Sequence, residues 1–228
     1  MIGGFVIDGF RRAGSPPAPP AEPAALPAVE DSATTAITGY VELNAGVAVD
    51  TSVAAALLVF VSVVSAHDWD PAVTHNGDGM ALLARMADEN TLWVFGRAGP
   101  DRLGAGSVAV TSANYPGPGA IIAVALSGVD ESTPWEDIAT ATGNPTATPS
   151  VDTTGANRLL VACGSNRFTG SSAPLSASGY TAIVSNTADA AHIVTALARA
   201  ADTAGSYSAA VTTSTNGVTA ALVAVKPA

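Results

Sequence analysis

Two long stretches of this chain follow the same order of sequence patterns. Residues 57–128 and 158–227 each begin with a short aliphatic run, pass through a polar loop and continue with three segments typical of β-strands. Each then ends on an Ala/Val strand, AIIAVAL in the first and ALVAV in the second. The stretches are offset by about 100 residues and agree in pattern more than in identity. A repeated run of short strands predicts a two-sheet β-domain.

The apolar runs predict an antiparallel β-sandwich of the jelly-roll or immunoglobulin-like type over residues 35–228, with half-repeats at about 53–128 and 156–228. We favour one sandwich over two small barrels. Residues 130–150 are predicted to cross between the halves, with one helical turn near Pro134–Ile138. The predicted strands are AITGYVEL (36–43), AALLVFVSVVSA (55–66), ALLARMAD (81–88), TLWVFGRA (91–98), GSVAVTSA (106–113), AIIAVALSG (120–128), RLLVACG, YTAIVSNT, HIVTALARA, YSAAVTTS and VTAALVAVK.

Residues 1–34 are predicted to form an extended arm. Six prolines lie between Pro16 and Pro27, and proline at this density favours a semi-rigid polyproline II spacer. The Gly-rich segment 1–13 before it is too small to fold alone, which indicates a peptide that docks on a partner. The alternative is an N-terminus without a role. The predicted docking residues are Ile2, Phe5, Val6, Ile7 and Phe10.

The composition excludes two classes of partner. The net charge is −10, with a single lysine, Lys226, and scattered arginines. Nucleic-acid binding needs clustered cations, and an anionic membrane would repel this chain. The longest apolar run, 53–66, is too short to span a bilayer, and the first residues do not match a secretion signal. We therefore expect no membrane insertion and synthesis in a cytoplasm without export.

The densest polar cluster lies in the loop AHDWDPAVTHNGDG. Its oxygen ligands, Asp68, Asp70, Asn76 and Asp78, are calcium candidates, but their spacing does not match an EF-hand. His67 and His75 form no recognised zinc pattern. We favour a surface loop whose Asp and Asn side chains cap turns, and we predict no cofactor.

Catalytic motifs are not apparent in the sequence. The acids fall in predicted turns, the three tryptophans are dispersed, and no G-x-S-x-G elbow is present. The single cysteine, Cys163, lies in an apolar strand and is interpreted as a buried hydrophobe. We therefore predict that the protein is not an enzyme.

Two segments carry a resemblance to known proteins. LSGVDESTPWED (126–137) resembles a motif of a broad group of β-sandwich proteins found in bacteriophage particles and on bacterial surfaces. The strands NRLLVACGS, GSYSAAVTTS and VTAALVAVKP look like that group's second-half strands. The resemblance covers about residues 40–228 and implies that Asp130, Thr133 and Pro134 shape a turn. The opening MIGGFVIDGF is similar to short starts of some tailed-phage virion proteins.

The resemblance implies a bacteriophage virion surface protein with a duplicated β-sandwich, either capsid decoration, head fibre or tail-associated. We expect it to be assembled in the host cytoplasm, to be displayed on the virion exterior and to contact capsid or tail proteins through its arm. A homo-oligomer is expected, with a trimer favoured. The alternative is a carbohydrate-binding module for host adsorption, with glycan contacts at Trp69, Asp70, Asn114 and Tyr115.

Overall fold

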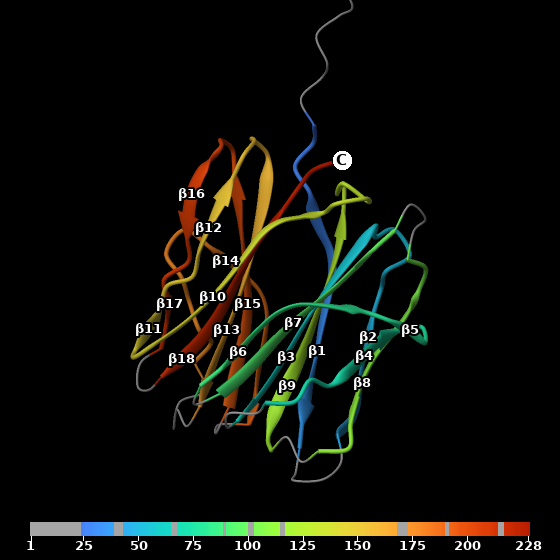
Figure 1. Cartoon of the computed structure of the whole chain (residues 1–228), viewed down its shortest axis with the longest axis vertical. Coiled ribbons are helices and arrows are strands. Elements are labelled where there is room, and N and C mark those ends of the chain that lie inside the picture. Colours follow the sequence, from blue (N-terminus) through green and yellow to red (C-terminus); the bar gives the residue numbers. More distant parts are fainter. Residues whose placement is uncertain are drawn as a thin grey trace, which may run out of the picture.

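The computed structural model of the protein describes residues 24–38, 43–64, 68–88, 90–99, 103–114, 117–167, 173–189, 192–213 and 217–228. These residues form antiparallel β-sheets, and no helix occurs among them (Figure 1). The prediction of an all-β fold with antiparallel sheets is therefore confirmed, and the arrangement is consistent with a β-sandwich. Accordingly, no described segment is a helix that could cross a membrane.

The strands fall into a first half, residues 24–129, and a second half, residues 130–228. Those of the first half are β1 (Ala28–Ile37), β2 (Leu43–Val49), β3 (Ala56–Val64), β4 (Ala72–His75), β5 (Asp78–Gly79), β6 (Ala81–Ala87), β7 (Asn90–Ala98), β8 (Gly106–Ser112) and β9 (Gly119–Ser127). Those of the second half are β10 (Trp135–Gly143), β11 (Thr146–Ala147), β12 (Ser150–Thr153), β13 (Arg158–Arg167), β14 (Thr181–Asp189), β15 (His192–Ala201), β16 (Gly205–Ser208), β17 (Val211–Thr212) and β18 (Val218–Val225).

Each half contributes one five-stranded sheet. The strand order is β1-β9-β3-β7-β6 in the first half and β10-β18-β13-β15-β14 in the second. In both sheets the first strand of the half lies at an edge, and the last strand lies beside it. The edge strand β1 lies against β14, and β6 lies against β10. The two sheets therefore meet along both pairs of edges (Figure 1).

Smaller sheets cover the outer faces of the five-stranded sheets. In the first half this cover is the four-stranded sheet β2-β8-β4-β5. In the second half it consists of two short pairs, β11-β17 and β12-β16. A bridge between Ser176 and Thr212 lies beside the first of these pairs. The molecule is thus layered, with the two large sheets at its centre.

Irregularities in the edge strands occur at matching places. The pairing of β1 with β9 shifts between Val29 and Asp31, and that of β10 with β18 shifts between Trp135 and Asp137. Bulges of this kind turn a strand and increase its local twist. The inner strands show no shift in their pairing with one another. The edges of both sheets are therefore bent at the same point of the first strand.

The two aspartates after these bulges make the same hydrogen bond. Asp31 Oδ2 accepts from the backbone N–H of Asp50 at 2.6 Å, and Asp137 Oδ2 accepts from that of Asp152 at 2.8 Å. Each bond ties a first strand to the end of the following segment in the covering layer. Both halves therefore use a carboxylate to join their large sheet to its cover.

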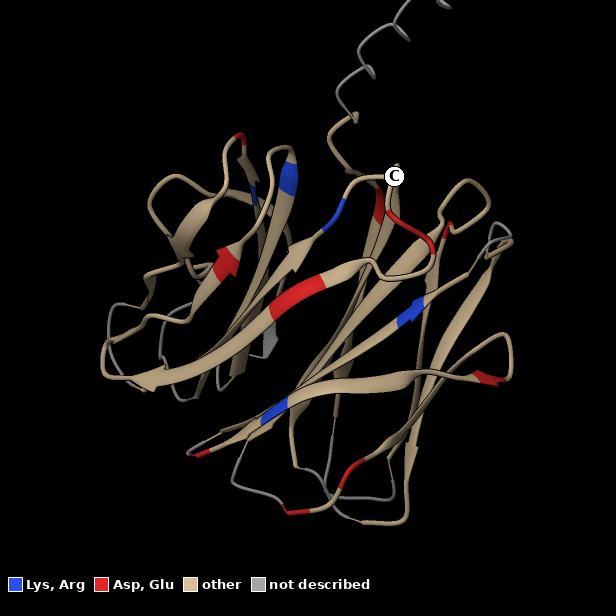
Figure 2. Cartoon of the chain, turned by 45° about the horizontal axis from the view of Figure 1, so that its top comes forward, with Lys and Arg blue, Asp and Glu red and all other residues tan. Residues whose placement is uncertain are grey.

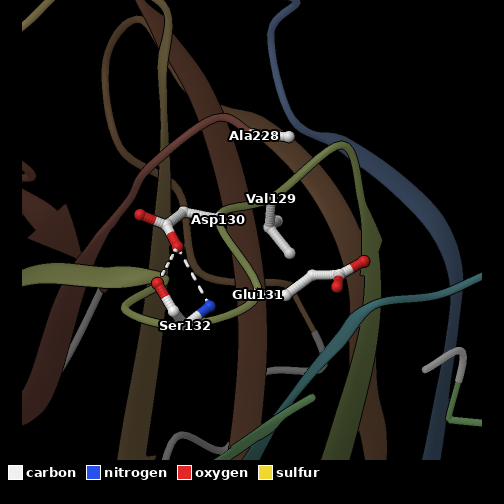
Figure 3. A pocket seen from close by; sticks show the side chains of 5 residues that line it. All are labelled: Val129, Asp130, Glu131, Ser132 and Ala228. Atoms are coloured by element: carbon white, nitrogen blue, oxygen red, sulfur yellow. Dashed lines mark hydrogen bonds between the residues drawn. The ribbon is translucent and has the colours of Figure 1, made fainter. Parts of the chain in front are cut away.

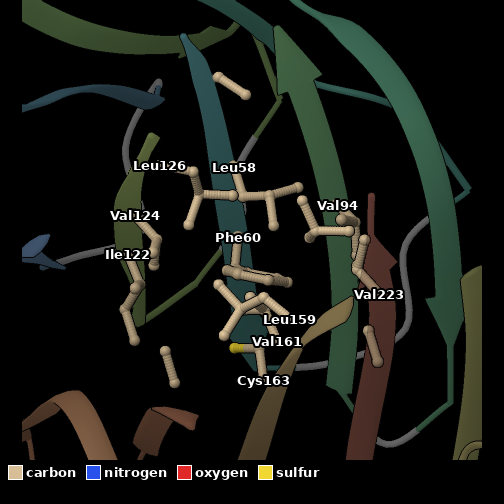
Figure 4. Close-up of a cluster of buried hydrophobic side chains, with 14 of the residues drawn as sticks. Leu58, Phe60, Val94, Ile122, Val124, Leu126, Leu159, Val161, Cys163 and Val223 are labelled. Atoms are coloured by element: carbon tan, nitrogen blue, oxygen red, sulfur yellow. The ribbon is translucent and has the colours of Figure 1, made fainter. Parts of the chain in front are cut away.

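Three apolar cores separate the layers. The central core lies between the two five-stranded sheets and includes Leu58, Phe60, Val124, Val161 and Cys163 (Figure 4). A second core fills the first half between its large sheet and β2-β8-β4-β5. A third core fills the corresponding space in the second half. Because each large sheet is covered on both faces, its inner strands are the continuous apolar runs of the sequence.

Residues 130–150 differ from the sequence prediction. The predicted helical turn near Pro134–Ile138 is wrong, because the chain pairs with β18 from Trp135 onward. Ile138 faces the central core, whereas Ala139 and Ala141 face the outer core of the second half. This alternation is that of a strand. The expected crossover therefore contains the edge strand β10 and the short strand β11.

Three other boundaries also differ. β1 begins at Ala28, so residues 28–34, which the sequence assigned to the spacer, belong to the sheet. The segment AITGYVEL is not one strand, because β1 ends at Ile37 and β2 begins at Leu43. YSAAVTTS is divided between β16 and β17. In each case a polar or small-residue stretch has no apolar run to mark the boundary.

Candidate functional site

A polar cluster is buried at the contact of the two halves. Ser62 Oγ donates to Ser165 Oγ at 2.6 Å, and His192 Nε2 lies 3.1 Å from Ser62 Oγ and 3.4 Å from Ser165 Oγ. Asn90 Nδ2 lies 3.5 Å from the Ser165 carbonyl oxygen. Ser62 and Ser165 occupy matching places in β3 and β13, and Asn90 and His192 begin β7 and β15.

The burial of this cluster decides what it can do. A serine beside a histidine is the arrangement of a hydrolase nucleophile and its base. Here Ser62, Ser165 and Asn90 are fully buried and His192 is 1% exposed. A substrate therefore cannot reach the hydroxyl groups. Hydrogen bonds inside an otherwise apolar contact instead fix the register of the two halves.

Cys163 is the other buried nucleophile. Its side chain is fully buried in the central core, which confirms the prediction from the sequence (Figure 4). Burial raises the pKa of the Cys163 thiol well above its usual range. The thiolate, which is the reactive form, is thus both rare and inaccessible.

We expect Cys163 to resist a thiol reagent such as DTNB for as long as the protein stays folded. The same reagent should label one thiol per chain at once in a denaturing concentration of urea. Absorbance at 412 nm measures both reactions. Rapid stoichiometric labelling in native buffer would contradict the burial of this residue.

The carboxylate of Asp130 stabilises a turn in the linker between the halves. Asp130 Oδ1 accepts from the N–H groups of Ser132 and Thr133, both at 3.0 Å, and from Ser132 Oγ at 2.7 Å. Asp130 Oδ2 accepts from Thr133 Oγ1 at 3.0 Å, and Lys226 Nζ lies 3.7 Å away. These hydrogen bonds hold the pKa of Asp130 well below its usual range, those from Ser132 contributing most. The turn role predicted for Asp130 and Thr133 is confirmed.

A pocket of about 550 Å³ lies beside this turn (Figure 3). It is lined by Val129, Asp130, Glu131, Ser132 and Ala228. Because the carboxylate of Asp130 is occupied by the turn and stays ionised, it cannot act as a general acid. None of the described residues that line the pocket is aromatic. Its geometry is therefore that of a turn packed beside a chain end.

A second pocket, of about 500 Å³, also borders the linker. Its wall includes Trp135, Gly96 and Arg97. A Cβ atom on Gly96 would lie 2.8 Å from the indole of Trp135, so glycine allows the ring to pack on β7. Trp135 packs against the central core and closes this end of the contact between the halves. The ring therefore serves packing.

Two of the four predicted glycan-contact residues, Trp69 and Asp70, interact with other side chains of the protein. The ring centres of Trp69 and Trp93 are 5.3 Å apart, and Trp69 packs against the core of the first half. Asp70 Oδ1 accepts from Trp93 Nε1 at 2.9 Å and lies 3.6 Å from Arg85 Nη1. Asn114 is exposed, and Tyr115 lies outside the described residues. A glycan contact at this place stays a prediction.

Three of the four calcium candidates, Asp70, Asn76 and Asp78, bond to different groups of the protein. Asp78 Oδ2 lies 2.7 Å from Arg97 Nη2, and the side chain of Asn76 bonds to the backbone of Ala105 and Ser107 around the start of β8. Asp68 is exposed. Within the described ranges, no three His, Cys, Asp or Glu residues are grouped so that they could hold a metal.

His75 is the histidine of this loop that lies within the described residues. His75 is fully buried, with Nε2 3.1 Å from Thr51 Oγ1, and His67 lies outside the described residues. Burial lowers the pKa of His75, and the charge of Arg97 lowers it further. His75 is therefore a neutral core residue beside its hydroxyl partner.

Charges in the described residues are few and dispersed (Figure 2). One grouping was missed by the sequence reasoning, namely Arg199 between Tyr180 and Tyr207. These residues come from three separate segments, so no local motif marks them. The anchor residues Ile2, Phe5, Val6, Ile7 and Phe10 lie outside the described residues.

Comparisons of the chain with protein-family models, with curated proteins and with solved structures each found no match.

Proposed function

We propose that this chain is a non-enzymatic structural protein of a tailed-phage virion. In this proposal the N-terminal arm attaches the protein to the capsid or tail, and the β-sandwich is displayed on the particle exterior. The sandwich would act as a decoration, a spike or the base of a fibre. The proposal combines the composition of the arm, the resemblances of the sequence and the way in which the chain enters the folded part.

The entry of the chain is the observation that carries the proposal. Residues 24–27 lead directly into β1, which pairs with β9 over its whole length. Asn157 Nδ2 from the second half donates to the carbonyl oxygen of Ala24 at 2.8 Å. The start of the fold is thus bonded to both halves. A pull on the arm would be passed to the central sheets rather than to a loose end.

The arrangement of the ends also suits a displayed module. Ala228 N–H donates to the carbonyl oxygen of Gly128 at 3.0 Å, and Leu26 and Pro27 lie beside Gly128. The C-terminal residue, the linker and the incoming chain therefore share one end of the molecule (Figure 1). The opposite end would face away from the attachment point.

The chemistry inside the molecule supports a structural role. The serine and histidine groups at the contact of the halves are buried, and Asp130 is occupied by its turn. The small-residue sheets are covered on both faces and joined by hydrogen bonds. A body whose layers are covered and joined in this way suits display on a particle surface.

We further propose that the two halves are an internal duplication. The matching strand orders, edge bulges and aspartate bonds support this reading. The sequence carries traces of it, because VED (29–31) matches WED (135–137), and VDTS (49–52) matches VDTT (151–154). The repeating unit would then begin at β1 and β10, earlier than the half-repeats predicted from the sequence.

Deleting residues 1–13 should abolish incorporation into particles while leaving the sandwich folded. Burial of Phe5, Ile7 and Phe10 would contribute roughly 1.5–3 kcal/mol each, and many copies on one particle multiply such contacts. Incorporation is measured by quantitative blotting of purified particles, and folding by urea denaturation.

A full-length variant with Phe5→Ser and Phe10→Ser is the matched control for chain length. It should be lost from particles like the truncated chain, with its free energy of unfolding unchanged within about 0.5 kcal/mol. If the truncated protein still decorates particles at the wild-type level, the proposed anchor is wrong.

A further inference from the structure

Arg199 has an unusual setting on the outside of the second half. The residue is exposed on β15, and its guanidinium carbon lies over two rings, 5.4 Å from the centre of Tyr207 and 5.8 Å from that of Tyr180. Tyr207 Oη donates to the carbonyl oxygen of Thr203 at 2.7 Å, and Tyr180 Oη donates to that of Ser208 at 3.3 Å. The rings are therefore held in place and restrict the guanidinium.

Arg199 also differs from the other described cations in having no carboxylate partner among the described residues. Every other Lys or Arg whose side chain is described lies within 4 Å of a carboxylate. These pairs are Arg85–Asp70, Arg97–Asp78, Arg158–Glu136 and Lys226–Asp130. Within the described part of the chain, Arg199 makes neither an ion pair nor a hydrogen bond. Its rings cover the face of the guanidinium, and its N–H groups lie at the edge.

The first half has an arginine at the equivalent strand position, Arg97, and this arginine is paired with an acid. Arg97 faces Leu57 in β3, and Arg199 faces Leu160 at the matching place in β13. Arg97 Nη2 lies 2.7 Å from Asp78 Oδ2. Asp78 precedes the glycine that leads toward β6.

In the second half the aligned sequence position carries no acid. Ser178 precedes Gly179, which leads toward β14. The guanidinium of Arg199 reaches this turn, because a Cβ atom on Gly179 would lie 3.7 Å from Arg199 Nη1. The arginine is thus in position, and the carboxylate that satisfies Arg97 is replaced by an exposed serine.

We propose that Arg199 binds a carboxylate supplied by an acidic glycan, at the place that the Asp78 carboxylate occupies in the first half. A guanidinium fixed by rings presents parallel N–H donors, which match the two oxygens of a carboxylate. The protein has a net charge of −10, so the attraction for an anion is local to the exposed guanidinium of Arg199. The site lies on the folded body, and the inference does not depend on how the arm attaches.

The surroundings favour a sugar acid over an acidic protein. The exposed neighbours in the two turns include the hydroxyl-bearing residues Ser178, Thr203 and Ser206, together with Asp202, which makes no ion pair with Arg199 within the described residues. A protein interface centres on a buried apolar or aromatic cluster. The large hydrophobic residues that are exposed in the described part are Leu26, Val53 and Leu82, none of them in this half. Hydroxyl groups around one cation suit a uronate or sialate unit.

The test is an NMR titration of the full-length protein with a galacturonate trisaccharide. A galactose trisaccharide and a tri-glutamate peptide serve as probes for the neutral sugar and for the carboxylate on a peptide. We expect shifts of the amide signals near residues 178–180 and 199–207 with the acidic sugar alone. Affinity should fall with added salt, because one ion pair carries the contact.

Variants at two positions make the test specific. Arg199→Gln should weaken binding at least about tenfold, because it removes hydrogen bonds to a charged group. Ser178→Asp should weaken it equally by supplying the carboxylate from within, whereas Ser178→Ala should bind like the wild type. Unchanged binding by Ser178→Asp, equal or stronger binding of the peptide, or no binding of any probe would each overturn the proposal.

Discussion

Phe60→Ala is expected to lower the free energy of unfolding by about 3–5 kcal/mol, which is the usual cost of truncating a buried aromatic side chain. Phe60 is fully buried near the middle of the central core, between the two five-stranded sheets (Figure 4). Its ring fills space between strands that are themselves fixed by pairing on both sides. Those strands cannot close the cavity without losing register, so the cost should lie within this range. Urea denaturation followed by far-UV circular dichroism measures it.

The control for this variant is Leu82→Ala on the edge strand β6. Leu82 is 42% exposed, so the same kind of truncation should change stability by about 0.5 kcal/mol or less. A double variant tests whether the stability lost in Phe60→Ala comes from packing between the two large sheets. Cys163 occupies in β13 the place that Phe60 occupies in β3. Phe60→Cys together with Cys163→Phe should restore part of the stability that Phe60→Cys loses. Equal losses at Phe60 and Leu82 would contradict the central core.

Arg158→Ala is expected to cost about 3 kcal/mol or more at pH 7, because it leaves a buried carboxylate without its partner. Arg158 Nε lies 2.6 Å from Glu136 Oε2, and the two side chains are 14% and 8% exposed. The pair ties β10 to the start of β13. The variant Arg158→Met with Glu136→Leu removes both charges and should retain most of the wild-type stability.

The pH dependence identifies the carboxylate. Burial raises the pKa of Glu136, but the hydrogen bonds from Arg158 and Thr154 outweigh it and bring the pKa to about 2, below the ordinary 4.5. A group whose pKa is lower in the folded state stabilises the fold above the unfolded pKa. This contribution is complete above pH 4.5 and is lost as the pH falls toward 2. The stability difference between wild type and Arg158→Ala should therefore shrink from pH 7 to pH 3. A difference that stays constant with pH would contradict this role of Glu136.

The inner strands could be predicted from the sequence for a physical reason. β3, β9, β13 and β18 are covered on both faces, so each is a continuous apolar run. The edge strands β1 and β10 lack such an apolar run, because they are half-buried and rich in Ala and Thr. β1 also follows the prolines, and β10 follows Pro134. Their sequences therefore looked like a spacer and a crossover.

The candidate sites were harder to predict than the fold. Ser62, Ser165 and His192 come together only through the pairing of distant strands, and no spacing in the sequence indicates their contact. Arg199 and its tyrosines are likewise dispersed. The sequence does contain a sign that Arg199 lacks a partner acid. NGDGM (76–80) of the first half aligns with SASGY (176–180) of the second, where serine replaces the aspartate. That alignment shows the lost acid only once the strand register is known.

Cryo-electron microscopy of intact virions that carry this chain tests the central proposal most directly. The proposal predicts density for the layered β-sandwich standing off the particle, with residues 1–13 buried in a neighbouring capsid or tail protein and the prolines spanning the gap. The end that holds Ala24, Gly128 and Ala228 should face the particle. Particles that hold the chain through a sheet face, with the arm free in solvent, would contradict it.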